Sequence, residues 1–144
     1  MLELTERETI EDVDRLRQGL EACRALGVRI AADDVGAGNA GLRLLSLVTF
    51  DVVKIDLSLV QDALTNEPSA EILGALRDMA SRRGAVVVAE GVETSAQLRL
   101  VKSVGIDAAQ GYLLGRPGEA LTVDSIDIQT LLETNRSARV SAAA

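Results

Sequence analysis

RIAADDVGAGNAGLRLL, residues 29–45, begins as an apolar run, places two aspartates side by side, and then changes into a glycine-rich segment. The apolar run contains β-branched residues and is bounded by glycines, which predicts a strand buried on both faces. Leucines at 42, 44 and 45 predict one or two helical turns after the glycines. A pair such as Asp33 and Asp34 is by itself common in turns and helix caps. Its meaning therefore depends on the rest of the chain.

The same order of strand and helix recurs along the sequence. Further strands are predicted within 2–5, 50–56, 85–93 and 106–114. Amphipathic helices are predicted over 9–26, 68–83, 94–104 and 125–133, and residues 135–144 are predicted to be a disordered tail. No hairpin signal interrupts this alternation. The sequence therefore predicts an α/β fold with a parallel sheet, formed as one unit over residues 1–134.

Helix ends carry the usual chemical signals. Thr9 is predicted to cap the first helix, with Asp12 in the position of a capping-box partner. Thr94 and Gln97 form a second predicted capping box. Cys23, the single cysteine, has helical spacing with apolar neighbours and is predicted to be a small core residue.

Composition limits the classes of function. Apolar residues make up 47% of the 144 residues and the net charge is −7, so the surface is expected to repel nucleic acids, both DNA and RNA. The amino-terminal residues lack the pattern of a secretory signal, and no apolar run approaches a membrane span, so we expect a cytoplasmic protein. The chain has no histidine. A metal site must then use oxygen ligands, which favours Mg²⁺ or Mn²⁺ over zinc.

Polar residues recur where the predicted strands end. They are Glu3, Glu6, Asp33, Asp34, Lys54, Asp56, Glu90, Glu93 and Gln110. The carboxyl ends of parallel strands meet at one edge of a sheet, so these side chains are expected to converge there, although each acid alone would suit a solvated surface. Converging carboxylates repel one another unless cations compensate them, and two divalent ions suit phosphoryl transfer. Lys54 would neutralise charge on a phosphoryl oxygen or steer a water, and Asp56 would hold its ammonium.

The glycine-rich segment GAGNAG, residues 36–41, does not match known phosphate loops. It lacks a following Lys-Ser or Lys-Thr and the GxGxxG spacing. Gly36 and Gly38 are therefore interpreted as parts of a flexible loop beside the aspartates.

Five motifs together resemble the bacterial EAL domain, the family of cyclic di-GMP phosphodiesterases. ELTE (3–6) is similar to ExTE, DDVGAG (33–38) to DDFGTG and KID (54–56) to KxD. AEGVE (89–93) is similar to the identical family string, and QGYLLGRP (110–117) resembles the signature of the last strand. The five occur in the order of the family and span nearly the whole chain.

The resemblance implies a TIM-type (β/α)₈ barrel that hydrolyses cyclic di-GMP to pGpG with two Mg²⁺ or Mn²⁺ ions. Carried over by position, Glu3 would bind one metal, Asp33 would bridge both, and Asp34 and Glu90 would serve the second. Lys54 would orient the water or the phosphate, with Asp56 and Gln110 close by. Glu6 would brace the glycine loop of Gly36 and Gly38, and Glu93 would support the site.

The chain also departs from the family. An eight-stranded barrel needs about 250 residues, whereas five strand ends are visible here, and the strands that carry Glu-Ala-Leu and a metal-binding Asn are missing. The resemblance thus implies a partial barrel, weak or inactive alone, that pairs as a homodimer or belongs to a longer signalling protein. Val35 and Ala37 replace the family's Phe and Thr, and Asn39 and Ala40 replace a Ser pair. These changes affect loop packing more than metal chemistry.

Two other functions fit parts of the sequence. One is a noncatalytic EAL-derived module that binds cyclic di-GMP or metal, or mediates dimerisation, in signalling. The other is a flavodoxin-like receiver with Asp56 as phosphoacceptor. Its acceptor should follow the acidic pair by about two strands, and its last strand should end in Lys-Pro, so the spacing argues against a receiver.

Overall fold

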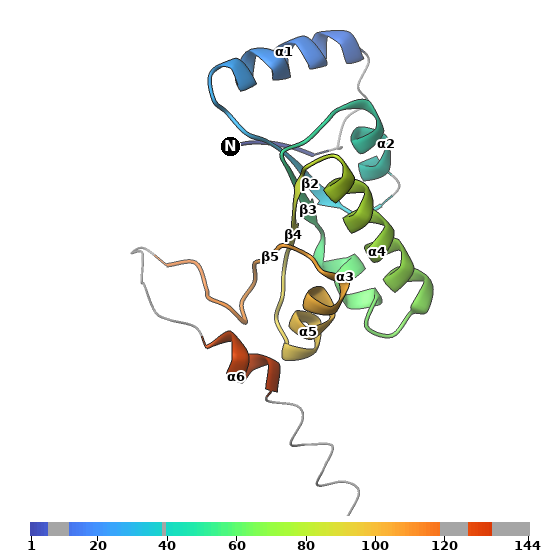
Figure 1. The fold of residues 1–144 in the computed structure, drawn as a ribbon, viewed down its shortest axis with the longest axis vertical. Coiled ribbons are helices and arrows are strands. Elements are labelled where there is room, and N and C mark those ends of the chain that lie inside the picture. The colour runs from blue at the N-terminus through green and yellow to red at the C-terminus, as the bar shows by residue number, and fades with distance from the viewer. Residues whose placement is uncertain (6–11, 39, 119–126, 134–144) are drawn as a thin grey trace, which may run out of the picture.

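The computed structural model describes residues 1–5, 12–38, 40–118 and 127–133. Five strands form one parallel sheet: β1 (Leu2–Leu4), β2 (Ile30–Val35), β3 (Val52–Ile55), β4 (Val86–Ala89) and β5 (Ala108–Ala109). The helices are α1 (Val13–Ala25), α2 (Ala40–Leu47), α3 (Leu57–Asp62), α4 (Glu67–Arg82), α5 (Ser95–Val104) and α6 (Ile128–Glu133) (Figure 1). The predicted α/β alternation is confirmed.

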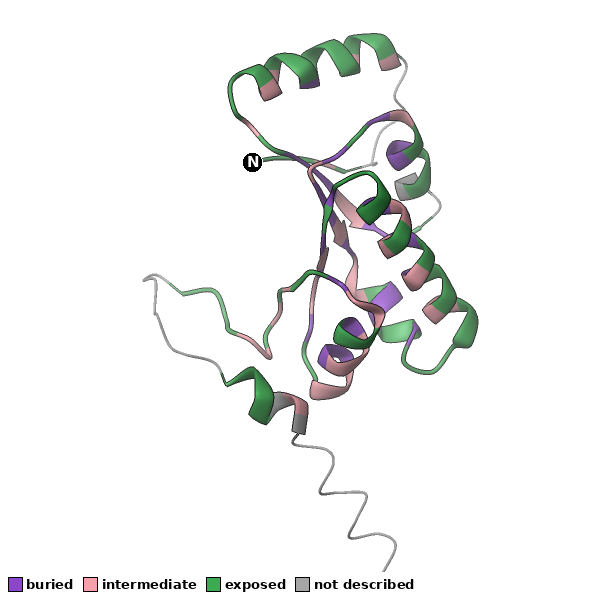
Figure 2. Ribbon diagram, viewed as in Figure 1, coloured by how far each residue is buried: buried purple, intermediate pink, exposed green. Residues whose placement is uncertain are grey.

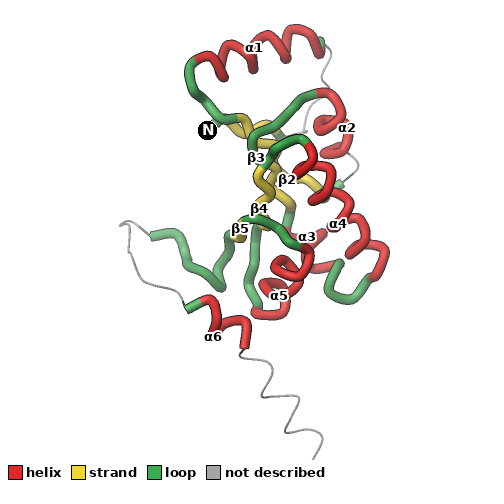
Figure 3. Tube along the Cα trace, viewed as in Figure 1, coloured by secondary structure: helices red, strands yellow, loops and turns green. Residues whose placement is uncertain are grey.

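Each strand pairs in parallel with the next strand of the chain, in the order β1-β2-β3-β4-β5. This sequential order is typical of a (β/α)₈ barrel, whereas a receiver places its first strand inside the sheet. The helices α2, α4 and α5 lie along one side of the strands (Figure 3). The sheet is therefore an arc of a TIM-type barrel, and the receiver topology is excluded for the strands that the structure describes.

The core lies between the sheet and its helices (Figure 2). In β2, Ile30, Ala31 and Ala32 are consecutive and fully buried. A strand with both faces covered produces this pattern, as predicted from its unbroken apolar run. Leu73 and Leu76 of α4 belong to the same buried core. Burial of both faces fixes the register of the central strands and so positions the residues at their ends.

Two helix boundaries follow from local chemistry. The side chain of Thr94 accepts a hydrogen bond from Gln97 N, and Gln97 Oε1 accepts one from Thr94 N at 2.8 Å, which confirms the predicted capping box of α5. Helix α1 differs from the prediction because Asp12 itself is the cap, accepting from Arg15 N at 2.9 Å, and the helix begins at Val13. Thr9 lies outside the described residues. Cys23 is half-buried against the core.

Three elements differ in extent from the prediction. The six-residue α3 was not predicted, because its sequence continues the apolar run of β3. The predicted fifth strand shrinks to two residues, since the chain turns at Gly111 against the backbone of Val92. Helix α6 begins at Ile128 within the described residues, and Ser125, its predicted start, lies outside them. The predicted tail, 135–144, lies outside the described residues.

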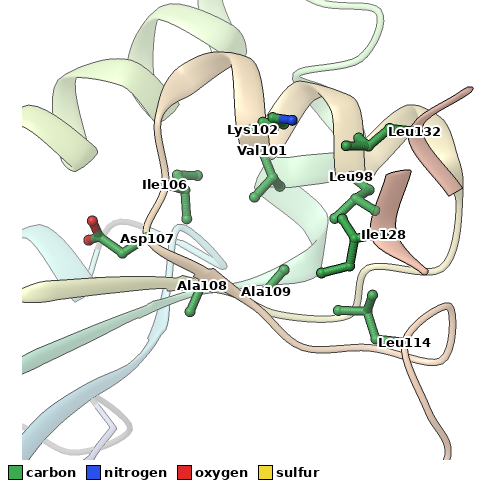
Figure 4. A pocket seen from close by; sticks show the side chains of 10 residues that line it. All are labelled: Leu98, Val101, Lys102, Ile106, Asp107, Ala108, Ala109, Leu114, Ile128 and Leu132. Carbon is green, nitrogen blue, oxygen red and sulfur yellow. The ribbon is translucent and has the colours of Figure 1, made fainter. Parts of the chain in front are cut away.

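An apolar cavity of about 290 Å³ lies between α5, β5 and α6 (Figure 4). Its walls include Leu98, Val101, Ile106 and Ile128, and Arg99 ties α6 to α5 by donating to the carbonyl of Leu132 at 3.2 Å. The lining is mainly apolar, with Lys102 and Asp107 as its two charged residues. Among the described residues, no helix has both the length and the apolar character that a bilayer crossing requires.

Candidate active site

A β-bulge in β2 explains why two adjacent aspartates serve one site. Successive side chains of a regular strand point to opposite faces. Here the register shifts, because Ala32 pairs with Val53 and Val35 pairs with Ile55. Between these two pairings β2 advances by three residues and β3 by two, so β2 contains one extra residue. Asp34 has φ +56°, a left-handed conformation that aspartate tolerates better than most residues. Oxygens of Asp33, Asp34 and Glu90 consequently lie within 4.8 Å of one another.

Lys54 connects four neighbouring strands at their carboxyl ends. Its Nζ lies 2.8 Å from Asp33 Oδ1, 2.9 Å from Glu90 Oε1 and 3.3 Å from Glu3 Oε1. The carboxylates come from β1, from β2 and from the residue after β4, while Lys54 belongs to β3. The lysine side chain is 13% exposed. We call Glu3, Asp33, Asp34, Lys54 and Glu90 the rim cluster.

The surroundings of Lys54 determine its protonation. Burial lowers the pKa of the ammonium, but hydrogen bonds from it to Asp33 and Glu90, together with their negative charge, outweigh burial and raise the pKa above its ordinary value. Lys54 therefore stays protonated at neutral pH. It is a donor of hydrogen bonds and positive charge, and it is unsuited to act as a general base.

The donor set of the rim cluster fits a hard divalent cation. Asp33, Asp34 and Glu90 offer carboxylate oxygens from half-buried positions, and oxygen ligands are those that Mg²⁺, Mn²⁺ and Ca²⁺ prefer. Glu3, the fourth predicted metal ligand, reaches the cluster through its contact with Lys54. The residues predicted to bind metal thus gather at one edge of the sheet.

Asp56 does not hold Lys54, contrary to the expectation. Its carboxylate accepts from Ser58 N at 2.9 Å and also from Ser58 Oγ, which makes it the N-cap of α3. The ion pairs of Lys54 within 4.0 Å go to the rim cluster instead. The sequence could not distinguish a carboxylate that binds a neighbouring ammonium from one that caps the following helix.

Gln110 and Glu93 lie at the same edge of the sheet as the rim cluster. Gln110 is exposed; its N–H donates to Ala89 O at 2.8 Å, and its carbonyl accepts from Val92 N at 2.9 Å. Glu93 is exposed too, and its N–H donates to Gln97 Oε1 at 2.8 Å. Glu6 lies outside the described residues. Backbone bonds therefore anchor Gln110 and Glu93, and the structure assigns their side chains no partner among the described residues.

Two glycines allow α3 to pack beneath the rim cluster. Gly36 has φ +101°, and a Cβ there would lie 2.9 Å from Leu59 Cδ2. Gly91, which sequence reasoning missed, follows Glu90 with φ +62°, and a Cβ there would lie 2.7 Å from Leu57 Cβ. Gly38 has open space around its Cα. A larger residue at Gly36 would therefore collide with Leu59 of α3.

Two acids at the opposite edge of the sheet have a different role, which sequence reasoning also missed. Asp51 Oδ2 accepts from Ile30 N at 2.7 Å, and Asp107 Oδ2 accepts from Val87 N at 2.8 Å. Asp51 lies just before β3 and accepts a hydrogen bond from the amino end of β2. Asp107 lies just before β5 and accepts one from the amino end of β4. The signal in the sequence is an aspartate one or a few residues before an apolar run. These acids stabilise the sheet, whereas the carboxyl-end acids gather around Lys54.

Comparisons with known proteins agree with this geometry. The family model described as EAL domain matches residues 1–117. A probable cyclic di-GMP phosphodiesterase, PdeA of Escherichia coli K12, is 38% identical over 117 residues, which cover 81% of this chain and 16% of that protein. The chain therefore spans less than a fifth of the length of this curated relative.

Solved structures show the same likeness. A standalone EAL protein from Vibrio cholerae O395, crystallised with c-di-GMP, superposes with a TM-score of 0.79 at 31% identity, covering 88% of this chain and 54% of that one. Klebsiella pneumoniae BlrP1, in a complex with manganese and cyclic di-GMP, gives a TM-score of 0.73 at 40% identity, covering 80% of this chain and 29% of that one. With five parallel strands in sequential order and acids gathered at their carboxyl ends, the chain belongs to the EAL domain family.

Proposed function

We propose that the rim cluster takes part in the metal-dependent hydrolysis of cyclic di-GMP to pGpG, as part of an EAL-type phosphodiesterase. The observation that carries the proposal is the meeting of Glu3, Asp33 and Glu90 around Lys54, from four adjacent strands. Acids spread over some ninety positions of sequence have no structural need to converge at this edge. The likeness to EAL proteins solved with cyclic di-GMP supports the choice of substrate.

Asp33, Asp34 and Glu90 would hold a divalent cation, Mg²⁺ or Mn²⁺, and Glu3 with Asp33 would serve a second one. When bound, such ions act as Lewis acids and lower the pKa of a coordinated water. The BlrP1 structures contain manganese or calcium, which supports a hard cation here. The oxygen-only donor set of the cluster agrees with this choice.

The reaction consumes one water. Its oxygen adds to phosphorus in one phosphodiester, the bond from phosphorus to O3′ breaks, and O3′ leaves with a proton, so that a 5′ phosphate and a 3′ hydroxyl remain. Lys54, held as an ammonium by its carboxylate neighbours, donates hydrogen bonds to the phosphoryl oxygens or orients the water. Gln110 would contact the water or the substrate from the last strand. Asp56, Gly36 and Gly38 would position the elements around the cluster, with Glu93 and Glu6 as further support.

We assign full activity to an assembled domain. The chain covers about half of the Vibrio cholerae EAL protein. We propose that a homodimer, or the remainder of a longer signalling protein, completes the barrel, and that the chain by itself is weak or inactive. The compartment that we propose is the cytoplasm, which cell fractionation would test.

A second candidate is a noncatalytic module that binds cyclic di-GMP or metal. One observation favours it: the ammonium of Lys54 already compensates the charge of three carboxylates, so that the cluster is stable without turnover. Binding without product would distinguish this candidate from the enzyme.

The test measures pGpG after incubation of the assembled domain, either the homodimer of the chain or the longer protein that contains it, with cyclic di-GMP and Mn²⁺ or Mg²⁺. Asp33→Asn and Glu90→Gln each remove one carboxylate of the cluster. Glu71→Gln, on the exposed side of α4, makes the same chemical change away from it. Turnover that disappears in the two cluster variants and persists in Glu71→Gln supports the enzyme. Nucleotide binding without turnover by the assembled domain supports the module, and a wild-type assembly that binds neither metal nor nucleotide overturns both.

A further inference from the structure

Aromatic residues are scarce in this chain. It has one tyrosine, one phenylalanine and no tryptophan. Phe50 is buried in the core at 4% exposure, whereas Tyr112 is 54% exposed. Tyr112 is therefore the one aromatic ring that the sequence presents to a ligand.

Tyr112 belongs to a tightly held turn after β5, residues 110–116, which we call the rim turn. Val92 N donates to Gln110 O at 2.9 Å, and Leu113 N donates back to Val92 O at 3.0 Å. A Cβ at Gly111 would lie 2.2 Å from Val92 N, so the backbone of the turn lies directly against the segment after β4. This backbone packing fixes the position of the tyrosine.

The rim turn borders the rim cluster. Gln110 N donates to Ala89 O at 2.8 Å, and Ala89 immediately precedes Glu90, which binds Lys54. Both the turn and the cluster lie at the carboxyl ends of the strands. A ligand that is bound at the cluster therefore has the rim turn beside it.

Arg116 lies over the ring of Tyr112, with its Cζ 4.5 Å from the ring centroid. Such a cation–π contact holds the planar guanidinium and leaves its N–H edge free to donate two parallel hydrogen bonds. None of the described residues accepts a hydrogen bond from Arg116 or forms an ion pair with it. Its donors are thus available at the rim.

Resting on the function proposed above, we propose that Arg116, held by Tyr112, recognises a guanine base of the cyclic dinucleotide. Guanine presents two acceptors, O6 and N7, on one edge, and the arginine fork matches them. Adenine presents N7 beside an N6 amino donor, which opposes an arginine donor. The Tyr112–Arg116 pair then makes the site prefer cyclic di-GMP to cyclic di-AMP.

The test compares equilibrium binding of the two nucleotides, in buffer with a divalent cation, to the whole chain and its variants. We expect the wild type to prefer cyclic di-GMP and Arg116→Met to reduce that preference about tenfold or more, with a smaller loss in Arg116→Lys, because an ammonium can also donate to guanine O6 and N7. Arg82→Met, an exposed arginine at the end of α4 and at the opposite edge of the sheet, should leave the preference unchanged. Tyr112→Phe retains the ring and should retain the preference, whereas Tyr112→Leu should weaken it.

Arg116→Met decides between base recognition and charge. If it weakens the binding of both nucleotides equally, Arg116 acts only through its charge and the inference is overturned. A wild type that binds both nucleotides without preference overturns it as well. A wild type that binds neither nucleotide overturns the proposed function itself, which separates the two failures.

Discussion

The ammonium nitrogen of Lys54 lies 2.8 Å from Asp33 Oδ1, between two strands that pair side by side. The contact between Lys54 and Asp33 joins β2 to β3 at the carboxyl edge. Glu90 Oε1, which follows β4, lies 2.9 Å from the same nitrogen and adds a third strand. One partly buried cation therefore holds together several acids that would otherwise repel one another. We therefore expect both metal affinity and fold stability to depend on this lysine.

Replacing Lys54 with methionine should destabilise the fold and strengthen metal binding. The carboxylates lose their counter-ion, which we expect to cost about 1–3 kcal/mol of unfolding free energy. A divalent cation no longer competes with the ammonium, so Mn²⁺ should bind more tightly and stabilise Lys54→Met more than the wild type. Urea unfolding with and without Mn²⁺ measures both effects. Lys102→Met, an exposed lysine of α5, should behave like the wild type, and equal Mn²⁺ stabilisation of all three proteins would contradict the prediction.

The same lysine predicts a stability change at alkaline pH. Because the pKa of Lys54 is raised above its ordinary value of 10.5 in the folded state, the folded protein holds this proton more tightly than the unfolded chain does. The stabilisation is therefore complete below the unfolded pKa and disappears as the pH rises through the folded one. The difference in unfolding free energy between wild type and Lys54→Met should stay constant up to a pH of about 9 and shrink above about 10.5. A difference that shrinks between pH values of about 6 and 8 would refute this.

Two substitutions of Asp34, which lies in the bulge, distinguish its effect on backbone conformation from its effect on metal binding. Asparagine tolerates the left-handed conformation, so Asp34→Asn should fold nearly as well as the wild type but bind Mn²⁺ more weakly. A β-branched valine is strained at φ +56°, so Asp34→Val should lose metal affinity and also about 1–2 kcal/mol of stability relative to Asp34→Asn. Thermal unfolding and calorimetric titration with Mn²⁺ provide the two measurements. Equal stability of the variants would mean that the strand reforms without its bulge.

Acids at the two edges of the sheet should respond differently to substitution. Asp107→Asn weakens the hydrogen bond to Val87 N, and Asp51→Asn weakens that to Ile30 N, so each should lower the unfolding free energy by about 1 kcal/mol. Neither acid belongs to the rim cluster, so Mn²⁺ affinity should stay unchanged. Asp33→Asn should show the reverse order of effects, with metal affinity reduced most. Loss of Mn²⁺ affinity in Asp107→Asn would show that the two edges are coupled.

Local sequence patterns predicted elements whose signals lie within a few residues. The capping box of Thr94 and Gln97 and the helix that begins near Pro68 were confirmed because these signals depend on neighbours along the chain. Helix α3 was missed because Leu57, Leu59 and Val60 continue an apolar run that fits a strand equally well. Asp12 was predicted to be the capping-box partner of Thr9, whereas it is itself the N-cap of α1. Both residue types are favoured at the N-cap, so the sequence did not distinguish them.

Residue order and composition were enough to predict the alternation of strands and helices, the oxygen-only character of any metal site, and the collection of acids at the carboxyl ends of the strands. Which of those acids share a cation became clear from the folded chain: the bulge brings Asp33 and Asp34 to one side, and packing turns Asp56 toward α3. The difference lies in the range of the interactions. Strand periodicity and helix caps depend on adjacent residues, whereas the contact of Lys54 with Glu3 and Glu90 depends on strand register and burial across residues far apart in the chain.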